Sequence, residues 1–152
     1  MKKLLIALAL RISFPAISQT SFMGIALDSP FPGEMSECPK SNLLDMVDPE
    51  LVKEAGMCYF VVRRGTYEIH NSPDLGLGHL LKVQTAAEKP ALFSFRFNKA
   101  KYDQAVDIFT SRFGKPKKTS SEKVHTRAGS EFNSRMNLWE GKILRIQLDE
   151  VG

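Results

Sequence analysis

The sequence predicts an α+β domain in which an antiparallel β-sheet carries one principal helix packed on one face. Three observations lead to this prediction. From residue 57 onward, apolar residues recur with a period of two between turn signals. One segment, residues 99–113, repeats its apolar residues at helical spacing. The links between strand-like segments are short, as hairpins require, so neighbouring strands should run antiparallel.

The elements before the helix follow from local patterns. Residues 21–27 predict a short strand, and a proline-rich connector follows. Asp48 can cap a short helix that begins at Pro49 and runs through Ala55, with Gly56 as the residue that stops it. Residues 57–63 are apolar on both faces, which is typical of a central strand. The expected hairpin and two further strands cover the following ranges: 66–70, 79–85 and 91–97.

The expected core joins a strand to the helix. Phe93, Phe95 and Phe97 share one strand face. Asn98 can cap the helix, and Gly114 can end it. The apolar stripe of the helix should pack on these phenylalanines, and its residues are Tyr102, Ala105, Val106, Phe109 and Phe113.

The last third predicts three more strands, over residues 123–127, 131–139 and 142–148. In the second of them, Phe132, Met136 and Leu138 are expected to point inward. Facing them with the apolar residues of the last strand requires a bulged or three-residue turn, with Gly141 at positive φ. Trp139 and Ile143 would then share the outer face.

The first eighteen residues have the plan of a secretory signal peptide, and residues 19–152 then form one α+β domain. The start is positively charged, an apolar run follows, and Ala16 and Ser18 have the spacing that a signal peptidase reads. Arg11 departs from the plan, because it shortens the apolar run. We therefore expect a periplasmic or secreted protein.

Charge and hydropathy argue against nucleic-acid binding and against a transmembrane anchor. The chain has 21 Lys+Arg and 17 Asp+Glu. The leader holds three of the basic residues and no acid, so 18 basic and 17 acidic residues remain, a net +1. Nucleic-acid binding requires a denser basic face. No stretch reaches the roughly 18 apolar residues of a membrane span, so we expect no transmembrane anchor.

Two cysteines, Cys38 and Cys58, favour one disulfide in an exported chain. Closing a loop of about 20 residues contributes about 3 kcal/mol in the chain-entropy model. The alternative is two separate buried thiols. The three histidines show no ligand spacing relative to the cysteines, so no metal or other cofactor is expected.

The common catalytic motifs are absent from the sequence. His70, Asp74 and His79 lie on one hairpin-to-loop excursion and could gather around a substrate or a metal, although solvated histidines are commoner. Asp103 and Asp107 are one helical turn apart, where a solvated face is expected. The apolar strand around Cys58 opposes a nucleophilic role for it.

A candidate interaction surface combines a basic tract with a tryptophan. Exposed tryptophan is a favoured interface anchor, although a second layer could cover it. The tract could equally be a solvated loop after the helix. The surface consists of Arg112, Lys115, Lys117, Lys118, Lys123, Arg127, Trp139 and Ile143.

Short motifs over most of the chain resemble those of small uncharacterised exported bacterial proteins. The motifs are Gly24-Ile25, Leu27, Pro30, Cys38-Pro39, Cys58-Tyr59 and the Phe113–Pro116 helix end, followed by strands that contain a tryptophan. The resemblance implies a periplasmic α+β domain and assigns no catalytic residue.

These observations favour a non-enzymatic interaction module, such as an inhibitor, an immunity-like protein or an envelope accessory factor, with a protein partner. The alternative is a small envelope-directed hydrolase that uses His70, Asp74 and His79. A third option is binding to an anionic surface through residues 112–127, which predicts steep salt dependence. The oligomeric state stays open.

Overall fold

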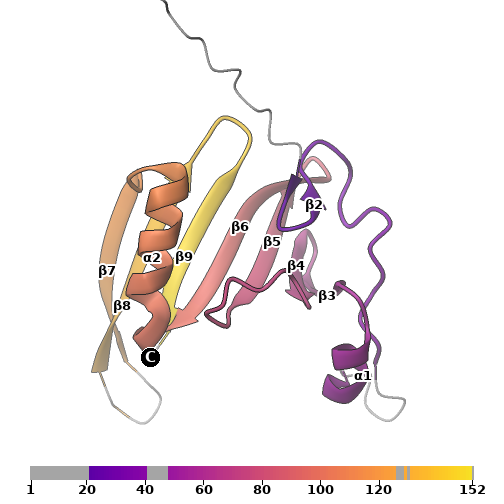
Figure 1. The fold of residues 1–152 in the computed structure, drawn as a ribbon, viewed down its shortest axis with the longest axis horizontal. Coiled ribbons are helices and arrows are strands. Elements are labelled where there is room, and N and C mark those ends of the chain that lie inside the picture. Colours follow the sequence, from indigo (N-terminus) through magenta and orange to yellow (C-terminus); the bar gives the residue numbers. More distant parts are fainter. Residues whose placement is uncertain (1–20, 41–47, 126–128, 130, 152) are drawn as a thin grey trace, which may run out of the picture.

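A seven-stranded sheet forms most of the structure, a computed structural model that describes residues 21–40, 48–125, 129 and 131–151. The strands stand in the order β3-β4-β5-β6-β9-β8-β7, and all neighbours are antiparallel except β6 and β9, which are parallel (Figure 1). Their bounds are β3 Cys58–Arg63, β4 Thr66–His70, β5 Leu80–Ala86, β6 Lys89–Asn98, β7 Lys118–His125, β8 Glu131–Glu140 and β9 Arg145–Val151.

The fold-class prediction is wrong. Of the described residues, 49% lie in strands and 18% are helical, so this part of the chain is mostly β, with two short helices rather than an α+β domain with one principal helix. The sheet is also mixed rather than antiparallel. The chain leaves β6, forms α2, β7 and β8, and returns with β9 inserted between β6 and β8. Such a long crossover is what a parallel pair requires, and short-range patterns do not reveal it.

The core lies on the face of the sheet that bears Phe93, Phe95 and Phe97, which we call the inner face; all three are fully buried. Helix α2, Lys99–Phe113, packs there, with Phe109 against Phe95. A small hairpin covers another part through Phe22, which contacts Phe93 and Phe95 (Figure 1). The hairpin is formed by β1 Ser21–Phe22 and β2 Ile25–Ala26. The expected packing of the helix stripe on the phenylalanines is confirmed.

Both helices begin where their sequences predict, and α2 also ends as predicted, whereas α1 ends at Glu54, one residue before the expected end, with extended Ala55 as its cap. The Asn98 side chain accepts from the backbone N–H of Lys101, and α2 ends at Gly114 with φ +79°. Helix α1, Pro49–Glu54, begins after Asp48, whose carboxylate accepts from the first-turn amides. A helix of six residues is too short to be stable alone, so tertiary contacts must hold it.

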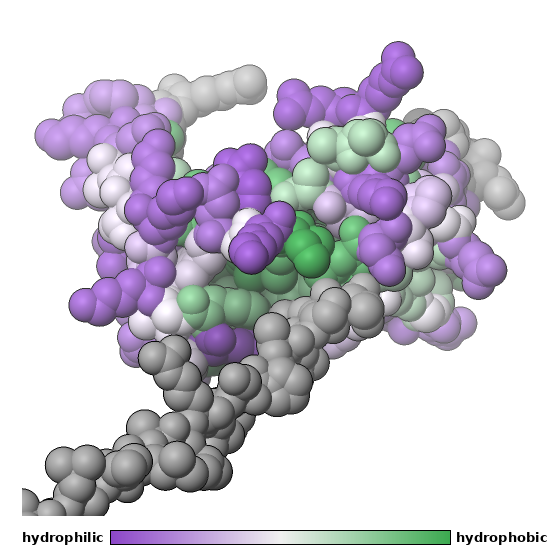
Figure 2. All heavy atoms as spheres, turned by 90° about the horizontal axis from the view of Figure 1, so that it is seen from above, coloured by the Kyte–Doolittle hydropathy of each residue, from purple (hydrophilic) through white to green (hydrophobic). Residues whose placement is uncertain are grey.

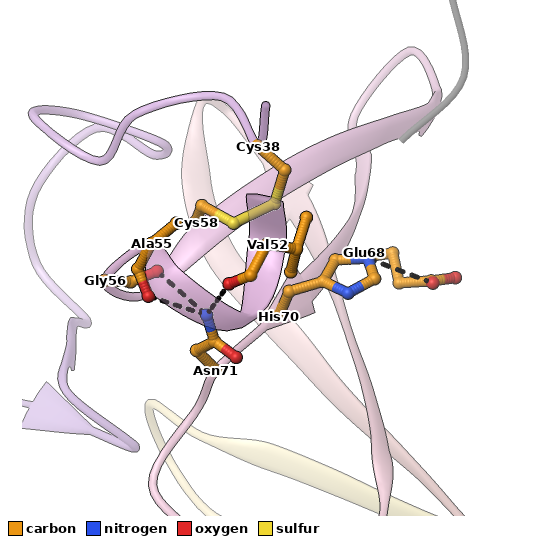
Figure 3. The surroundings of a disulfide bond; sticks show 8 residues. All are labelled: Cys38, Val52, Ala55, Gly56, Cys58, Glu68, His70 and Asn71. Atoms are coloured by element: carbon orange, nitrogen blue, oxygen red, sulfur yellow. Dashed lines mark hydrogen bonds and ion pairs between the residues drawn. A yellow bond between two sulfur atoms is a disulfide. The ribbon is translucent and has the colours of Figure 1, made fainter. Parts of the chain in front are cut away.

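Asn71 and the disulfide supply those contacts. The Asn71 side-chain amide donates to the carbonyl oxygens of Val52 and Ala55 at the end of α1 (Figure 3). Val52 packs on the Cys38–Cys58 disulfide, and both cysteines are buried. The predicted disulfide is therefore confirmed, and α1 sits inside the loop that it closes. An oxidising compartment is compatible with this bond.

Strand β3 is an edge strand, which corrects its predicted central position. Its apolar residues are sheltered in another way, because residues 36–38 run along its free side. Cys38 N–H donates to Tyr59 O at 2.9 Å, and Tyr59 N–H donates to Ser36 O at 3.1 Å. The C-terminal half of β3 stays uncovered, since Val61 and Val62 are 43% and 44% exposed.

The face assignment of β8 is also corrected. Trp139 lies opposite Ile146, and Met136 opposite Asp149, so Trp139 points inward and Met136 outward. The expected pairing of Met136 with Ile146 is absent, and Gly141 is not among the glycines with positive φ. The side chains of Arg135, Asn137 and Trp139 point inward instead, and each forms a hydrogen bond there.

That polar layer connects α2 to β8 and β9. The Tyr102 hydroxyl donates to the carbonyl oxygen of Leu148 and accepts from Asn137 at 2.9 Å. Burial raises the pKa of Tyr102 to about 12. Arg135 binds the buried carboxylate of Glu150, with Nε 2.7 Å from Oε2, and also reaches Asp103. The Arg135 guanidinium lowers the pKa of Glu150.

The expected signal peptide, residues 1–18, lies outside the described residues. Within the part of the chain that the structure describes, no helix is long and apolar enough to span a membrane.

Candidate binding cleft beside Trp139

A cleft of about 350 Å³ opens where α2 ends and the β8–β9 turn folds over it. Seen from this end of the molecule, apolar side chains gather in a hollow between hydrophilic ones (Figure 2). Leu27 comes from the N-terminal hairpin region and Phe113 from the last turn of α2. The remaining lining residues are Lys115, Lys117, Trp139, Glu140, Gly141, Lys142, Ile143, Leu144 and Ile146. The volume lies in the range of small-ligand pockets.

Trp139 forms part of the floor of this cleft and is not an exposed anchor. Only 5% of it is exposed, its ring packs on Phe109, and its indole N–H donates to the carbonyl oxygen of Gly114 at 2.7 Å. The expectation that Trp139 and Ile143 share an outer face is therefore wrong. Ile143 lies in the β8–β9 turn and is 61% exposed, which makes it the apolar side chain most available to a partner.

Lysines surround the opening. Lys117 forms an ion pair with Glu140 at 2.5 Å, and Arg145 approaches the same carboxylate at 3.4 Å. Lys117 thereby lowers the pKa of Glu140. Lys115 and Lys142 have no ion-pair partner among the described residues, so the rim carries uncompensated positive charge.

The structure gathers only part of the predicted interaction surface. Lys115, Lys117, Trp139 and Ile143 line the cleft. Arg112 lies over the ring of Phe113, 5.7 Å from its centroid, and does not line the cleft.

The rest of the predicted basic tract is dispersed. Lys118 and Lys123 are an odd number of residues apart on β7, so their side chains leave opposite faces of the sheet. Lys123 also faces Glu131 at 4.0 Å. Arg127 lies outside the described residues. The described part of the tract therefore presents no single basic face.

The alternative site exists as a second cavity. His70, Asp74 and His79 all line a cavity of about 290 Å³. Sequence reasoning missed Ser72, which also lines it and whose Oγ is 3.0 Å from Nε2 of His79. A serine in a loop carries no sequence signal of its own; the fold brings it to His79.

The ring of His79 is oriented as a donor rather than a base. Nδ1 is buried without a hydrogen-bond partner among the described residues, and the Asp74 carboxylate accepts from Gly76 N–H at 2.8 Å. A buried unpaired N–H costs more than an unpaired lone pair, since acceptors tolerate incomplete satisfaction better. This places the proton on Nε2, donated to Ser72. Burial lowers the pKa of His79 and keeps the ring neutral.

Metal and thiol chemistry find no support in the described part of the chain. No three His, Cys, Asp or Glu side chains there are grouped closely enough to hold a metal ion. Cys58 is bonded to Cys38 and so presents no thiolate.

Comparison with known proteins finds no matching family model, no matching curated protein and no matching solved structure. The interpretation of both cavities therefore rests on their own geometry.

Proposed function

We propose that the protein is a non-enzymatic interaction module of the periplasm or of the secreted space. Its partner would be a protein segment that combines an apolar side chain with nearby carboxylates. The observation that carries the proposal is the Trp139 cleft, which exposed Ile143 lines together with Lys115 and Lys142.

The cleft suits such a segment for two reasons. Its floor is held by the Trp139–Gly114 hydrogen bond and by packing on Phe109, so little conformational entropy is lost on binding. Its rim offers two lysines that no carboxylate of the described chain neutralises, and complementary charge speeds encounter and fixes orientation.

A photo-crosslinking amino acid at position 143 tests the proposal in envelope extract. We expect defined adducts from position 143 and none from the same crosslinker at Lys101. Lys101 is exposed and lies in the first turn of α2, at the opposite end of the helix from Phe113, which lines the cleft. Introducing Lys115→Glu and Lys142→Glu together should reduce the yield of these adducts several-fold, because two attractive charges become repulsive.

The outcome decides between surfaces. Equal adduct yields from positions 143 and 101, or a yield that charge reversal leaves unchanged, contradict binding at the cleft. Adducts that persist in the charge-reversed variant but whose yield falls steeply with rising salt concentration favour the anionic-surface option instead.

A second candidate function, an envelope-directed hydrolase, is favoured by one observation, the 3.0 Å separation of Ser72 Oγ and His79 Nε2 in the second cavity. A nucleophile and a base need this spacing. The unpaired Nδ1 places this candidate second, because no described group orients the ring as a base.

Labelling with a fluorophosphonate probe separates the two candidates. An activated Ser72 reacts with the probe, and Ser72→Ala or His79→Gln abolishes the reaction. Labelling of the wild-type chain no greater than that of Ser72→Ala excludes the hydrolase.

A further inference from the structure

The two edges of the sheet differ. The β3 edge is covered by residues 36–38, whereas β7 has no hydrogen-bonded neighbour beyond β8 in the described chain (Figure 1). Every residue of β7 except Ser120 is exposed. A free edge strand presents a row of unpaired N–H and C=O groups, which is a template for another strand.

Charged residues on an edge normally prevent random pairing. Here they make β7 complementary to itself in one register. Lys118 and Glu122 lie on the same face, with Ser120 midway between them, opposite Leu138, Ser134 and Met136 of β8 respectively. Neither Lys118 nor Glu122 has an ion-pair partner among the described residues.

We propose that β7 pairs antiparallel with β7 of a second copy, about a two-fold axis through Ser120. Lys118 then faces Glu122 of the second copy, and Glu122 faces its Lys118. On the inner face, Thr119 and Ser121 of the two copies lie opposite each other and can exchange hydrogen bonds. The two sheets join into one.

Other registers are less favourable. A two-fold axis perpendicular to the sheet keeps each face continuous only if it passes through a residue position. Centred on Ser121, it places Lys118 opposite Val124 and Glu122 opposite Ser120. Centred on Glu122, it places two carboxylates directly opposite, which is destabilising.

The ends of the paired strands do not oppose the register. It brings Lys117 beside Lys123 of the second copy, but each already faces a carboxylate of its own chain. Lys117 is paired with Glu140 at 2.5 Å, and Lys123 lies 4.0 Å from Glu131. Because only about five residues of each strand pair, the contact is smaller than a standard interface, and we expect micromolar rather than nanomolar affinity.

Charge reversal tests the register by sedimentation equilibrium of the oxidised full domain. By symmetry, Lys118→Glu turns two attractive pairs into repulsive ones, as does Glu122→Lys, and each should weaken dimerisation about tenfold or more. The double variant Lys118→Glu/Glu122→Lys restores complementarity and should dimerise like wild type. Lys101→Glu, which changes net charge equally on α2, is the matched control. Thermal unfolding of each variant checks that it folds.

Cysteine crosslinking tests the same register independently. Ser120 faces its own copy, with the two Cα atoms about 4.5–5.5 Å apart, so Ser120→Cys should form an intermolecular disulfide readily. Val124 shares the face and is exposed, yet its two copies would be about 26 Å apart at 3.3 Å per residue, so Val124→Cys should not.

Three results overturn the proposal. They are a wild-type monomer up to several hundred micromolar, a double charge swap no better than either single variant, and Ser120→Cys crosslinking no faster than Val124→Cys. A monomer whose β7 amides become protected only with added acidic peptide would assign the edge to another partner.

Discussion

The indole N–H of Trp139 donates to the carbonyl oxygen of Gly114 across 2.7 Å, which ties β8 to the residue that ends α2. Gly114 has φ +79°, so the chain turns sharply there and leaves its carbonyl free for the indole. One hydrogen bond therefore fixes both the inward orientation of Trp139 and the floor of the cleft.

Replacing Trp139 separates the contributions of the ring and of its N–H. Trp139→Phe keeps most of the packing on Phe109 and should lower the free energy of unfolding by about 1–2 kcal/mol, through the lost hydrogen bond. Trp139→Ala should cost about 3–5 kcal/mol. Urea denaturation measures both. Losses below 1 kcal/mol for both variants would mean that Trp139 is not buried as described.

Arg135 neutralises the buried Glu150 carboxylate, and its removal should be costly. Arg135→Met should lower the free energy of unfolding by about 3 kcal/mol, the low end for a broken buried pair, because the Arg135 side chain is 38% exposed. Arg135→Met/Glu150→Leu should recover part of this loss, since no unpaired charge then remains. A double variant less stable than the single one contradicts this account. Chemical denaturation at pH 7 is the measurement.

Asn71 holds α1 through its side-chain amide and also adopts a positive φ of 53°. Asn71→Gly retains the backbone conformation and removes the amide, so it should cost about 1–2 kcal/mol. Asn71→Ala adds backbone strain of about 1 kcal/mol more. Hydrogen exchange should show faster exchange in α1 for both variants. Equal stability of Asn71→Gly and wild type would show that the amide contributes nothing.

The disulfide holds residues 36–38 against β3. Replacing Cys38 and Cys58 with alanine should lower the free energy of unfolding by about 3 kcal/mol. The amide of Tyr59, which donates to Ser36, should exchange faster in the variant. Unchanged exchange of this amide would mean that the segment stays in place without the bond.

Acid should weaken the fold through His79. Burial lowers its pKa below the ordinary value of 6.5, so between these values the unfolded chain binds more protons than the folded one. The stability that neutral His79 supplies is present above pH 6.5 and is lost as the pH falls through the lowered value. Urea midpoints at pH 7.5 and 5.5 should differ less for His79→Gln than for wild type. Equal differences would exclude His79 as the group responsible.

Local signals predicted the local structure well. Asp48, Asn98 and Gly114 fixed helix ends, because capping depends on neighbouring residues alone. The burial of Phe93 and its two partners followed from strand periodicity. The disulfide followed from two cysteines and the expectation of an exported chain.

The faces of β8 could not be predicted in this way. Its even positions hold Phe132, Met136 and Leu138, and apolar character alone points them inward. The fold turns Asn137 and Trp139 inward instead, because Tyr102 and Gly114 supply partners that lie more than 20 residues away. Periodicity carries no information about such partners, and it therefore predicts the wrong face for Trp139.

The same limit applies to sheet position. Apolar residues on both faces of β3 indicated a central strand, yet β3 is an edge that a distant segment shelters. The parallel pairing of β6 and β9 depends on where the chain returns after three elements. The meeting of Ser72 and His79 likewise depends on the path of a loop.

The cover over β3 determines how many neighbours one molecule can accept. A sheet with two open edges can add copies at both sides, and such growth has no natural end. With residues 36–38 against Tyr59, β7 is the longer open edge among the described strands, and the proposed pair of molecules leaves only the short stretch of β3 at Val61 and Val62 uncovered. Loss of the Cys38–Cys58 bond would therefore do more than destabilise the fold: by releasing this segment it would open β3 as a second edge, at which the proposed pair could add further copies.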